Sequence, residues 1–308
     1  MMVPPIPERL EKAIIFLRGE HDGRAWLDAL PERITHYAQL WNLTLESIAD
    51  SGAMSCCVYS TTLDGVPAVL KIPVDTDSGH VEVQLLQRWA AAHAAPEILQ
   101  CANDSGVFLM TRIIPGTIAW PIDGTDDAHR FGRLLTRLNQ PGLTQPPALK
   151  DVADIMTMRM DWARERFADP QYSDAMDHFR ASERLEHAQR VLDRLLETTA
   201  TQHVLHADLQ AKNILHGPDR WYTIDPLGAF GDINAEAGLW IAVQDSPGTT
   251  LDRLHQLYEH PLLDPIRLHA WTFMLSILEY RPYLPASATR MEAFVRASNV
   301  DTVLAAIR

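Results

Sequence analysis

The sequence predicts an α+β fold in two parts, a β-rich part followed by a mainly helical part. Between residues 43 and 116, short apolar runs alternate with turn residues, which is the pattern of antiparallel strands. From residue 126 onward, apolar residues recur at three- and four-residue steps in several long segments, which is the pattern of amphipathic helices. We therefore expect two domains, residues 1–112 and residues 113–308.

Composition and charge exclude several classes of protein. The chain has 308 residues, of which 46% are hydrophobic and 22% charged, as in ordinary globular proteins. No apolar run is long enough to span a bilayer, and the net charge of −13 argues against nucleic acid or anionic membrane as partners. The three cysteines, Cys56, Cys57 and Cys101, form neither a disulfide framework nor a zinc motif. The start of the chain lacks a signal-peptide pattern, so we expect a cytoplasmic protein, with a monomer favoured.

Two helices are expected before the strands. Residues 8–17 form a short helical segment, and residues 24–41 form a longer one. In the second segment one face is apolar, with Leu27, Leu30, Ile34, Tyr37 and Trp41 at helical spacing. Pro31 lies inside this segment and is expected to bend or divide the helix.

Three antiparallel strands are expected next, at residues 43–48, 56–61 and 67–72, with an Asp-Gly turn between the last two. Lys71 lies near the end of the third strand, and Glu82 is the one acidic residue of the helix predicted over residues 80–92. A lone lysine at a strand end is usually only solvated. Together with Glu82 and the loop described below, Lys71 becomes a candidate phosphate contact.

Two further segments are candidates for nucleotide binding. The turn at residues 51–55 contains Ser51, Gly52 and Ser55, whose backbone N–H groups and hydroxyls can cradle phosphate. Residues 96–116 predict two more strands and then a linker between the two parts. Backbone groups from Met110 to Arg112 are the expected partners of an adenine ring.

The most informative stretch is residues 204–228, VLHADLQAKNILHGPDRWYTIDPLG. The stretch contains three short apolar strands. Asp208 and Asn213 follow the first strand at the spacing D-x-x-x-x-N, and Asp225 opens the segment D-P-L-G after the third. Phosphoryl transfer needs a carboxylate that accepts the proton of the attacking hydroxyl and oxygen ligands that hold Mg²⁺. Asp208 suits the first role, whereas Asn213 and Asp225 suit the second. His206 is expected to shape the loop by hydrogen bonding rather than to catalyse.

Helical patterns cover most of the second part. We predict helices over the following ranges: 126–139, 152–167, 182–197, 235–244, 250–258, 264–280 and 291–307. Asp264 and Pro265 form a good helix start, with aspartate as the cap and proline at the first position.

These features together resemble a known family. The segments PAVLKIP, HADLQAKNIL and IDPLGAFGD, with the tryptophan- and leucine-rich segments at 26–31 and 41–45, resemble the aminoglycoside/hydroxyurea antibiotic resistance kinases of the protein-kinase-like fold. The resemblance covers roughly residues 25–240. It implies a two-lobe kinase that transfers the γ-phosphoryl group of ATP, with Mg²⁺, to a hydroxyl of a small molecule such as a streptomycin-like aminoglycoside.

The resemblance also assigns roles to residues and marks departures. It implies Asp208 as catalytic base, Asn213 and Asp225 as Mg²⁺ ligands, and Lys71, braced by Glu82, as phosphate contact. Where the family usually has glycine, this chain has Ala207, and Gln210 to Lys212 also depart from the family pattern. The family usually continues with Pro-Ala-Tyr-Asp after residue 232, and here the chain reads Ile-Asn-Ala-Glu.

The acceptor is left open by the residues alone. Asp232 and Glu236 are candidates for contact with a cationic acceptor; Asp232 alternatively supports the catalytic loop, and Glu236 alternatively lies on the surface. A kinase for another metabolite or for a non-aminoglycoside antibiotic is the alternative function. A non-catalytic nucleotide-binding pseudokinase is the remaining one, and the intact Lys71, Asp208, Asn213 and Asp225 speak against it.

Overall fold

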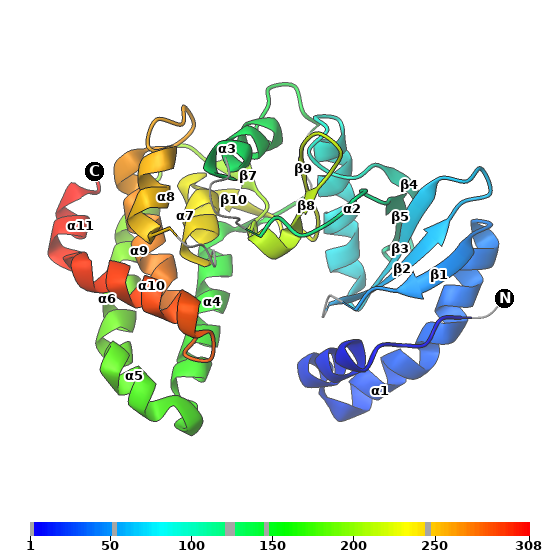
Figure 1. Cartoon of the computed structure of the whole chain (residues 1–308), viewed down its shortest axis with the longest axis horizontal. Helices are drawn as coiled ribbons and strands as arrows, with labels where there is room; N and C mark the ends of the chain where they lie inside the picture. The colour runs from blue at the N-terminus through cyan, green and yellow to red at the C-terminus, as the bar shows by residue number, and fades with distance from the viewer. Residues whose placement is uncertain (1–2, 51–53, 121–126, 145–147, 244–247) are drawn as a thin grey trace. The chain divides into compact units, whose positions relative to one another are not determined.

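The computed structural model of the chain describes residues 3–50, 54–120, 127–144, 148–243 and 248–308. The chain divides into two compact units, Met1–Gly116 and Thr117–Arg308. The division lies four residues after the expected boundary at 112/113. The first unit is an antiparallel sheet with helices, and the second is mainly helical (Figure 1), which is the predicted α+β class. Within the described ranges, no helix is both long and apolar enough to cross a membrane.

A five-stranded sheet in the order β1-β2-β3-β5-β4 forms the centre of the first unit, and every neighbouring pair is antiparallel. Its strands are β1 Thr44–Ile48, β2 Ser55–Thr61, β3 Pro67–Pro73, β4 Ile98–Ala102 and β5 Val107–Thr111. All five were predicted within a few residues, since the Asp64-Gly65 turn and the Ser105-Gly106 turn mark the two hairpins. Cys101 of β4 is exposed.

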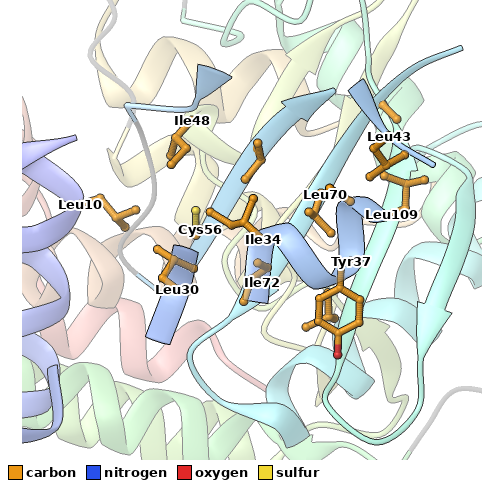
Figure 2. Packing of buried hydrophobic residues seen from close by; sticks show 14 of the residues in the cluster. Leu10, Leu30, Ile34, Tyr37, Leu43, Ile48, Cys56, Leu70, Ile72 and Leu109 are labelled. Carbon is orange, nitrogen blue, oxygen red and sulfur yellow. The ribbon is translucent and has the colours of Figure 1, made fainter. Parts of the chain in front are cut away.

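Helix α1, Glu8–Leu40, covers one face of this sheet. Figure 2 shows Leu30 and Ile34 of α1 against Cys56 and Ile72 of the sheet in one buried cluster. The helix is interrupted at Gly19, whose φ of 78° and ψ of 163° are not helical. Pro31 does not divide the helix but stays inside it, and the interruption lies at Gly19, because glycine adopts a positive φ without strain.

Strand β3 directs alternate side chains to opposite faces of the sheet. Leu70 and Ile72 belong to the cluster beneath α1. Lys71, between them, therefore points to the other face, where its Nζ meets Glu82 of helix α2, Thr76–Ala90. The side chain of Asp75 caps this helix by accepting a hydrogen bond from the Ser78 N–H.

The second unit consists mainly of helices, with small sheets in the order β6-β10-β7 and β8-β9. Its helices are α3 Asp127–Leu138, α4 Val152–Phe167, α5 Ser173–Phe179, α6 Ala181–Glu197, α7 Asn234–Val243, α8 Thr250–Leu257, α9 Pro265–Leu278, α10 Pro285–Ala297 and α11 Val300–Ala306, with 3-10 turns η1 Pro170–Tyr172 and η2 Ala211–Asn213. The strands are β6 Lys150–Asp151, β7 His203–Leu205, β8 Ile214–His216, β9 Trp221–Thr223 and β10 Ala229–Gly231.

Two predictions about these helices need correction. Residues 291–307 form two helices, α10 and α11, because Ser298 leaves the helical conformation and the side chain of Asn299 caps a new helix. Helix α5 and the short strands β6 and β10 were not predicted. The two strands contain two and three residues, too few for a period-two pattern to be recognised.

The core of the second unit holds the elements around residues 203–231 in place. Helices α7 and α9 pack closely, and both Trp240 and Trp271 are fully buried. Arg267 of α9 donates to Asp232 (2.7 Å), to the Thr199 hydroxyl (2.7 Å) and to the Leu195 carbonyl (2.9 Å). This side chain therefore ties the end of α6 to the segment that follows β10.

Candidate active site

Lys71 and Glu82 form a buried ion pair in the first unit. The Nζ of Lys71 donates to Oε1 of Glu82 at 2.6 Å, and both side chains are buried. The Nζ also lies 5.9 Å from the centre of the Phe108 ring. The pair that was predicted from the spacing in the sequence is therefore present, and its lysine is held where a phosphate group would find a fixed positive charge.

The other residues expected to bind the nucleotide lie in the turn at 51–55 and in the linker at 110–112. Ser51 and Gly52 lie outside the described residues. Ser55 is buried, and its hydroxyl lies 3.8 Å from the Cys57 sulfur. Met110 is paired with strands on both sides, and the Arg112 N–H already donates to the Pro67 carbonyl. The Arg112 guanidinium bonds to Glu46 at 3.0 Å. The adenine contacts expected around Met110 and Arg112 stay a prediction.

The loop of residues 206–213 in the second unit is fixed at both ends. Strand β7 enters it and pairs with β10, while η2 and β8 follow it. The His206 carbonyl accepts hydrogen bonds from the N–H groups of Leu227 and Gly228. The Asn213 carbonyl accepts one from the Ile224 N–H at 3.0 Å. The segment 224–228, which contains Asp225, is thereby held against the loop.

His206 supports the loop as predicted and is present in one neutral form. The Asp208 N–H donates to its Nδ1 (3.2 Å), so Nδ1 carries no proton. The proton is therefore on Nε2, which donates to the Ile224 carbonyl at 2.8 Å. Burial lowers the pKa of His206 to about 4, despite the nearby carboxylates. The imidazole is thus neutral at physiological pH, and its ring nitrogens are both used by the backbone.

Ala207 adopts a left-handed conformation with φ of 66°, which is unfavourable for residues other than glycine. Two buried side chains hold it there. Glu236 of α7 accepts a hydrogen bond from the Ala207 N–H at 2.7 Å, and Arg159 of α4 donates to the Ala207 carbonyl at 3.0 Å. This conformation directs the next residue, Asp208, away from the strand.

The Asp208 carboxylate accepts three hydrogen bonds and forms one further ion pair. Oδ1 accepts from Nη2 of Arg159 (2.7 Å) and from the Gln210 amide, and Oδ2 accepts from Nδ2 of Asn213 (2.9 Å). The Nζ of Lys212 forms an ion pair with Oδ2 at 3.1 Å. Burial raises the pKa of this carboxyl, but the charges of Arg159 and Lys212 outweigh burial, so the pKa lies below its usual range. The side chain retains 14% of its exposure. Asp208 is therefore an ionised, oriented and partly exposed carboxylate, which fits the predicted role of a general base.

Arg159 is the functional residue that sequence reasoning missed. Its Nη1 donates to Glu279 at 2.5 Å, while its Nη2 bonds to Asp208 and to the Ala207 carbonyl. Glu279 in turn pairs with Arg281 at 2.8 Å. The sequence did contain an indication of its burial, because Arg159 lies on the apolar stripe of α4 between Ile155 and Ala163. A charge at such a position is rarely buried without a partner.

Asn213 and Asp225 provide oxygen atoms that fit a magnesium ion. Both Nδ2 hydrogens of Asn213 are directed to Asp208, one to its carbonyl (2.8 Å) and one to Oδ2, which leaves the amide oxygen facing the opposite way. Asp225 has a positive φ of 58° and is half-buried. Amide and carboxylate oxygens are suitable Mg²⁺ ligands. No cluster of three or more His, Cys, Asp or Glu side chains that could hold a metal occurs in the described part of the chain.

Asp232 and Glu236, the candidates for contact with the acceptor, are both buried. Asp232 is buried and accepts hydrogen bonds from Arg267, Trp271 and Asn234. Glu236 is 3% exposed and supports Ala207 from beneath the loop. Burial raises the pKa of Glu236 to about 7. Glu236 therefore supports the loop at Ala207, Asp232 joins α7 and α9, and neither residue lies on the surface.

Fold and loop together define the class of this protein. A β-rich unit with a buried lysine–glutamate pair precedes a helical unit with an H-x-D-x-x-x-x-N loop and a following D-x-x-G. This combination of fold and motifs is typical of a protein-kinase-like phosphotransferase.

Comparison with known proteins identifies the family. Residues 41–279 match the model of the aminoglycoside/hydroxyurea antibiotic resistance kinases, and the chain belongs to that family. It is similar to the streptomycin 6-kinases of Streptomyces glaucescens, 27% identical over 281 residues, and of Streptomyces griseus, 26% identical over 282 residues; each alignment covers 87% of both chains. Among solved structures, a choline/ethanolamine kinase family protein from Mesorhizobium loti matches with a TM-score of 0.64 and 16% identity, covering 94% of this chain and 98% of that one. The family predicted from the motifs is confirmed.

Proposed function

We propose that this chain transfers the γ-phosphoryl group of ATP to a hydroxyl of a cationic, streptomycin-like aminoglycoside and thereby inactivates the antibiotic. The observation that carries the proposal is the Asp208 carboxylate, ionised and held by Arg159 and Asn213 within a loop of a kinase family. The two streptomycin 6-kinase relatives support the acceptor class. The net charge of −13 is compatible with a cationic acceptor.

In this proposal each residue has a limited task. Asp208 orients the acceptor hydroxyl and accepts its proton as the new oxygen–phosphorus bond forms. Lys71, braced by Glu82, contacts the nucleotide phosphates. Asn213 and Asp225 hold Mg²⁺, which when bound neutralises charge on the phosphate oxygens. Positioning and electrostatics supply most of the rate in such a reaction.

The experiment that tests the catalytic assignment is the substitution Asp208→Asn. The variant keeps the size of the side chain but lacks the base, so turnover should fall about 10²–10⁴-fold, while the affinity for ATP measured by calorimetry stays the same. Asp219→Asn is the matched control, because Asp219 lies in the same stretch but is exposed and paired with Arg220. Near-normal turnover of Asp208→Asn would exclude Asp208 as the base.

An acceptor screen tests the substrate. ATP consumption is measured with streptomycin, other aminoglycosides, cationic peptide antibiotics, hydroxyurea, sugars and amino alcohols. We expect streptomycin or a near relative to give the highest kcat/KM. Turnover of an amino alcohol or a sugar instead would assign the chain to another small-molecule kinase, and no turnover with any compound would favour the pseudokinase alternative.

A further inference from the structure

One side of the Asp208 carboxylate is covered by a charge and not by a hydrogen bond. A carboxylate offers about four lone-pair positions, and Asp208 accepts three hydrogen bonds, from Arg159, Gln210 and Asn213. The Lys212 ammonium lies 3.1 Å from Oδ2 as an ion pair. A hydroxyl that donates its proton to this group therefore needs the position that the ammonium covers.

Arg159, Asn213 and Lys212 differ in how firmly they are held beside Asp208. The Arg159 side chain is 2% exposed and is also bound by Glu279. Asn213 is buried and makes a second bond, to the Asp208 carbonyl. Lys212 has the longest contact, 3.1 Å, and its side chain is 53% exposed. Within the described part of the chain, Asp208 is the one acidic partner recorded for Lys212.

We propose that Lys212 is a displaceable cation that covers Oδ2 of Asp208 until the acceptor arrives, and that a cationic acceptor takes its place. This inference rests on the proposed function, in which Asp208 is the base. Lys212 is a positioning residue in this role, since it acts through Asp208. A cationic acceptor that displaces the ammonium group restores a positive charge beside the carboxylate, whereas a water molecule does not.

The inference gives Lys212 a protective function when no acceptor is bound. A water molecule at Oδ2 could attack the γ-phosphorus of ATP: its oxygen would bond to phosphorus, its proton would pass to Asp208, and the bond from phosphorus to the departing ADP oxygen would break. The Lys212 ammonium occupies the position that this water needs. Its presence therefore favours transfer to the acceptor over hydrolysis.

The first test measures ATP hydrolysis without acceptor, so it does not depend on knowing the acceptor. Lys212→Ala should raise the hydrolysis rate about twofold to fivefold, the range expected from loss of an exposed ion pair. Lys212→Arg should restore the low rate, because its guanidinium can pair with the same oxygen, and the double variant Asp208→Asn with Lys212→Ala should lose the increase. An unchanged or lower rate in Lys212→Ala would overturn the inference.

The second test separates KM from kcat for streptomycin as the acceptor. Lys212→Ala should lower the acceptor KM about twofold to fivefold, with kcat within twofold of the original. Lys12→Ala is the matched control, because Lys12 also forms an exposed i,i+4 pair, with Glu8. A tenfold loss of kcat would overturn the inference, since it would place Lys212 on the transferred phosphoryl group.

The two proposals fail in different ways. If no compound is phosphorylated but Lys212→Ala still hydrolyses ATP faster, the acceptor proposal fails, and only the protection of Asp208 from water by Lys212 stands. If streptomycin is phosphorylated but Lys212→Ala changes neither hydrolysis nor KM, the inference fails and the proposed function stands.

Discussion

Each unit of the molecule contains a buried ion pair, and the two pairs are built differently. In the first unit, Lys71 meets Glu82 across eleven positions of sequence, from a strand to the next helix. In the second unit, Arg159 meets Asp208 across 49 positions and Glu279 across 120. The first pair joins neighbouring elements, whereas the second joins α4 to a loop and to the end of α9.

The difference shows how lysine and arginine serve different purposes. The lysine ammonium is a compact charge on a flexible stem and can turn toward a phosphate. The arginine guanidinium is a planar fork with fixed donors, and here its two terminal nitrogens bind two carboxylates and one carbonyl. We therefore expect Lys71 to act on a ligand and Arg159 to act on the protein itself.

The largest expected effect is the loss of stability in Arg159→Met. Removing the guanidinium leaves Glu279 and the half-buried Asp208 without their shared cation, and breaking a buried pair typically destabilises by about 3–5 kcal/mol. Chemical denaturation should show a decrease of that order in the free energy of unfolding.

Lys71→Met is the comparison variant for Arg159→Met. It should reduce the affinity for ATP by about tenfold or more, since a hydrogen bond to a charged group contributes about 1.5–3 kcal/mol. Equal ATP affinity in Lys71→Met and the unchanged protein would contradict the division between a ligand-binding lysine and a structural arginine.

A second prediction concerns the pH dependence of stability. Burial raises the pKa of Glu236 from 4.5 to about 7. Between pH 4.5 and pH 7 the folded protein therefore keeps a proton on Glu236 that the unfolded chain has lost. The contribution of Glu236 to the free energy of unfolding falls by about 1.4 kcal/mol per pH unit as the pH rises through this range. The pKa of His206 is lowered from 6.5 to about 4, so its contribution rises with pH between those values and opposes that of Glu236.

Glu236→Gln should remove the fall in stability with rising pH that comes from Glu236. Relative to the unchanged protein, its free energy of unfolding should rise by on the order of 3 kcal/mol between pH 4.5 and 7. Urea unfolding at several pH values measures this difference. Glu197→Gln is the control, because Glu197 is exposed at the end of α6. Parallel pH profiles for Glu236→Gln and the unchanged protein would refute the raised pKa.

The smallest expected effect is a gain in stability for Ala207→Gly. Glycine relieves the left-handed conformation at residue 207, which costs other residues about 1–2 kcal/mol, and this exceeds the added entropy of the unfolded chain, about 0.5–1 kcal/mol. We expect a net gain of about 0.5 kcal/mol in the free energy of unfolding. Ala211→Gly, in the 3-10 turn of the same loop, should instead lose stability; a loss in both variants would mean that Ala207 is unstrained.

Features that depend on local sequence were predictable. The hairpins of the first unit follow from turn residues between apolar runs, and the pair of Lys71 and Glu82 follows from one strand and the helix after it. Asp208 and Asn213 are joined by a hydrogen bond within one short loop, and their spacing alone identified this loop. The roles of these residues stay predictions until the variants are measured.

Features that depend on distant contacts were not predictable. Arg159 gains its role from residues 49 and 120 positions away, and no spacing rule reaches that far. Glu236 was expected on the surface or at the acceptor, yet it is the one charged residue in an otherwise apolar helix, which indicates burial. The boundary between α10 and α11 depends on a single cap at Asn299, which an apolar pattern does not reveal.

The exposed thiol of Cys101 offers a handle for site-directed labelling. Cys56 is buried, and burial raises the pKa of its thiol to about 12, so it should react slowly. Cys101 lies beside a hollow of about 240 Å³ that is also lined by His80, Val83 and Gln87 of α2, the helix that carries Glu82. An environment-sensitive fluorophore on Cys101 would thus report on this helix, and nucleotide binding could be followed without any antibiotic present.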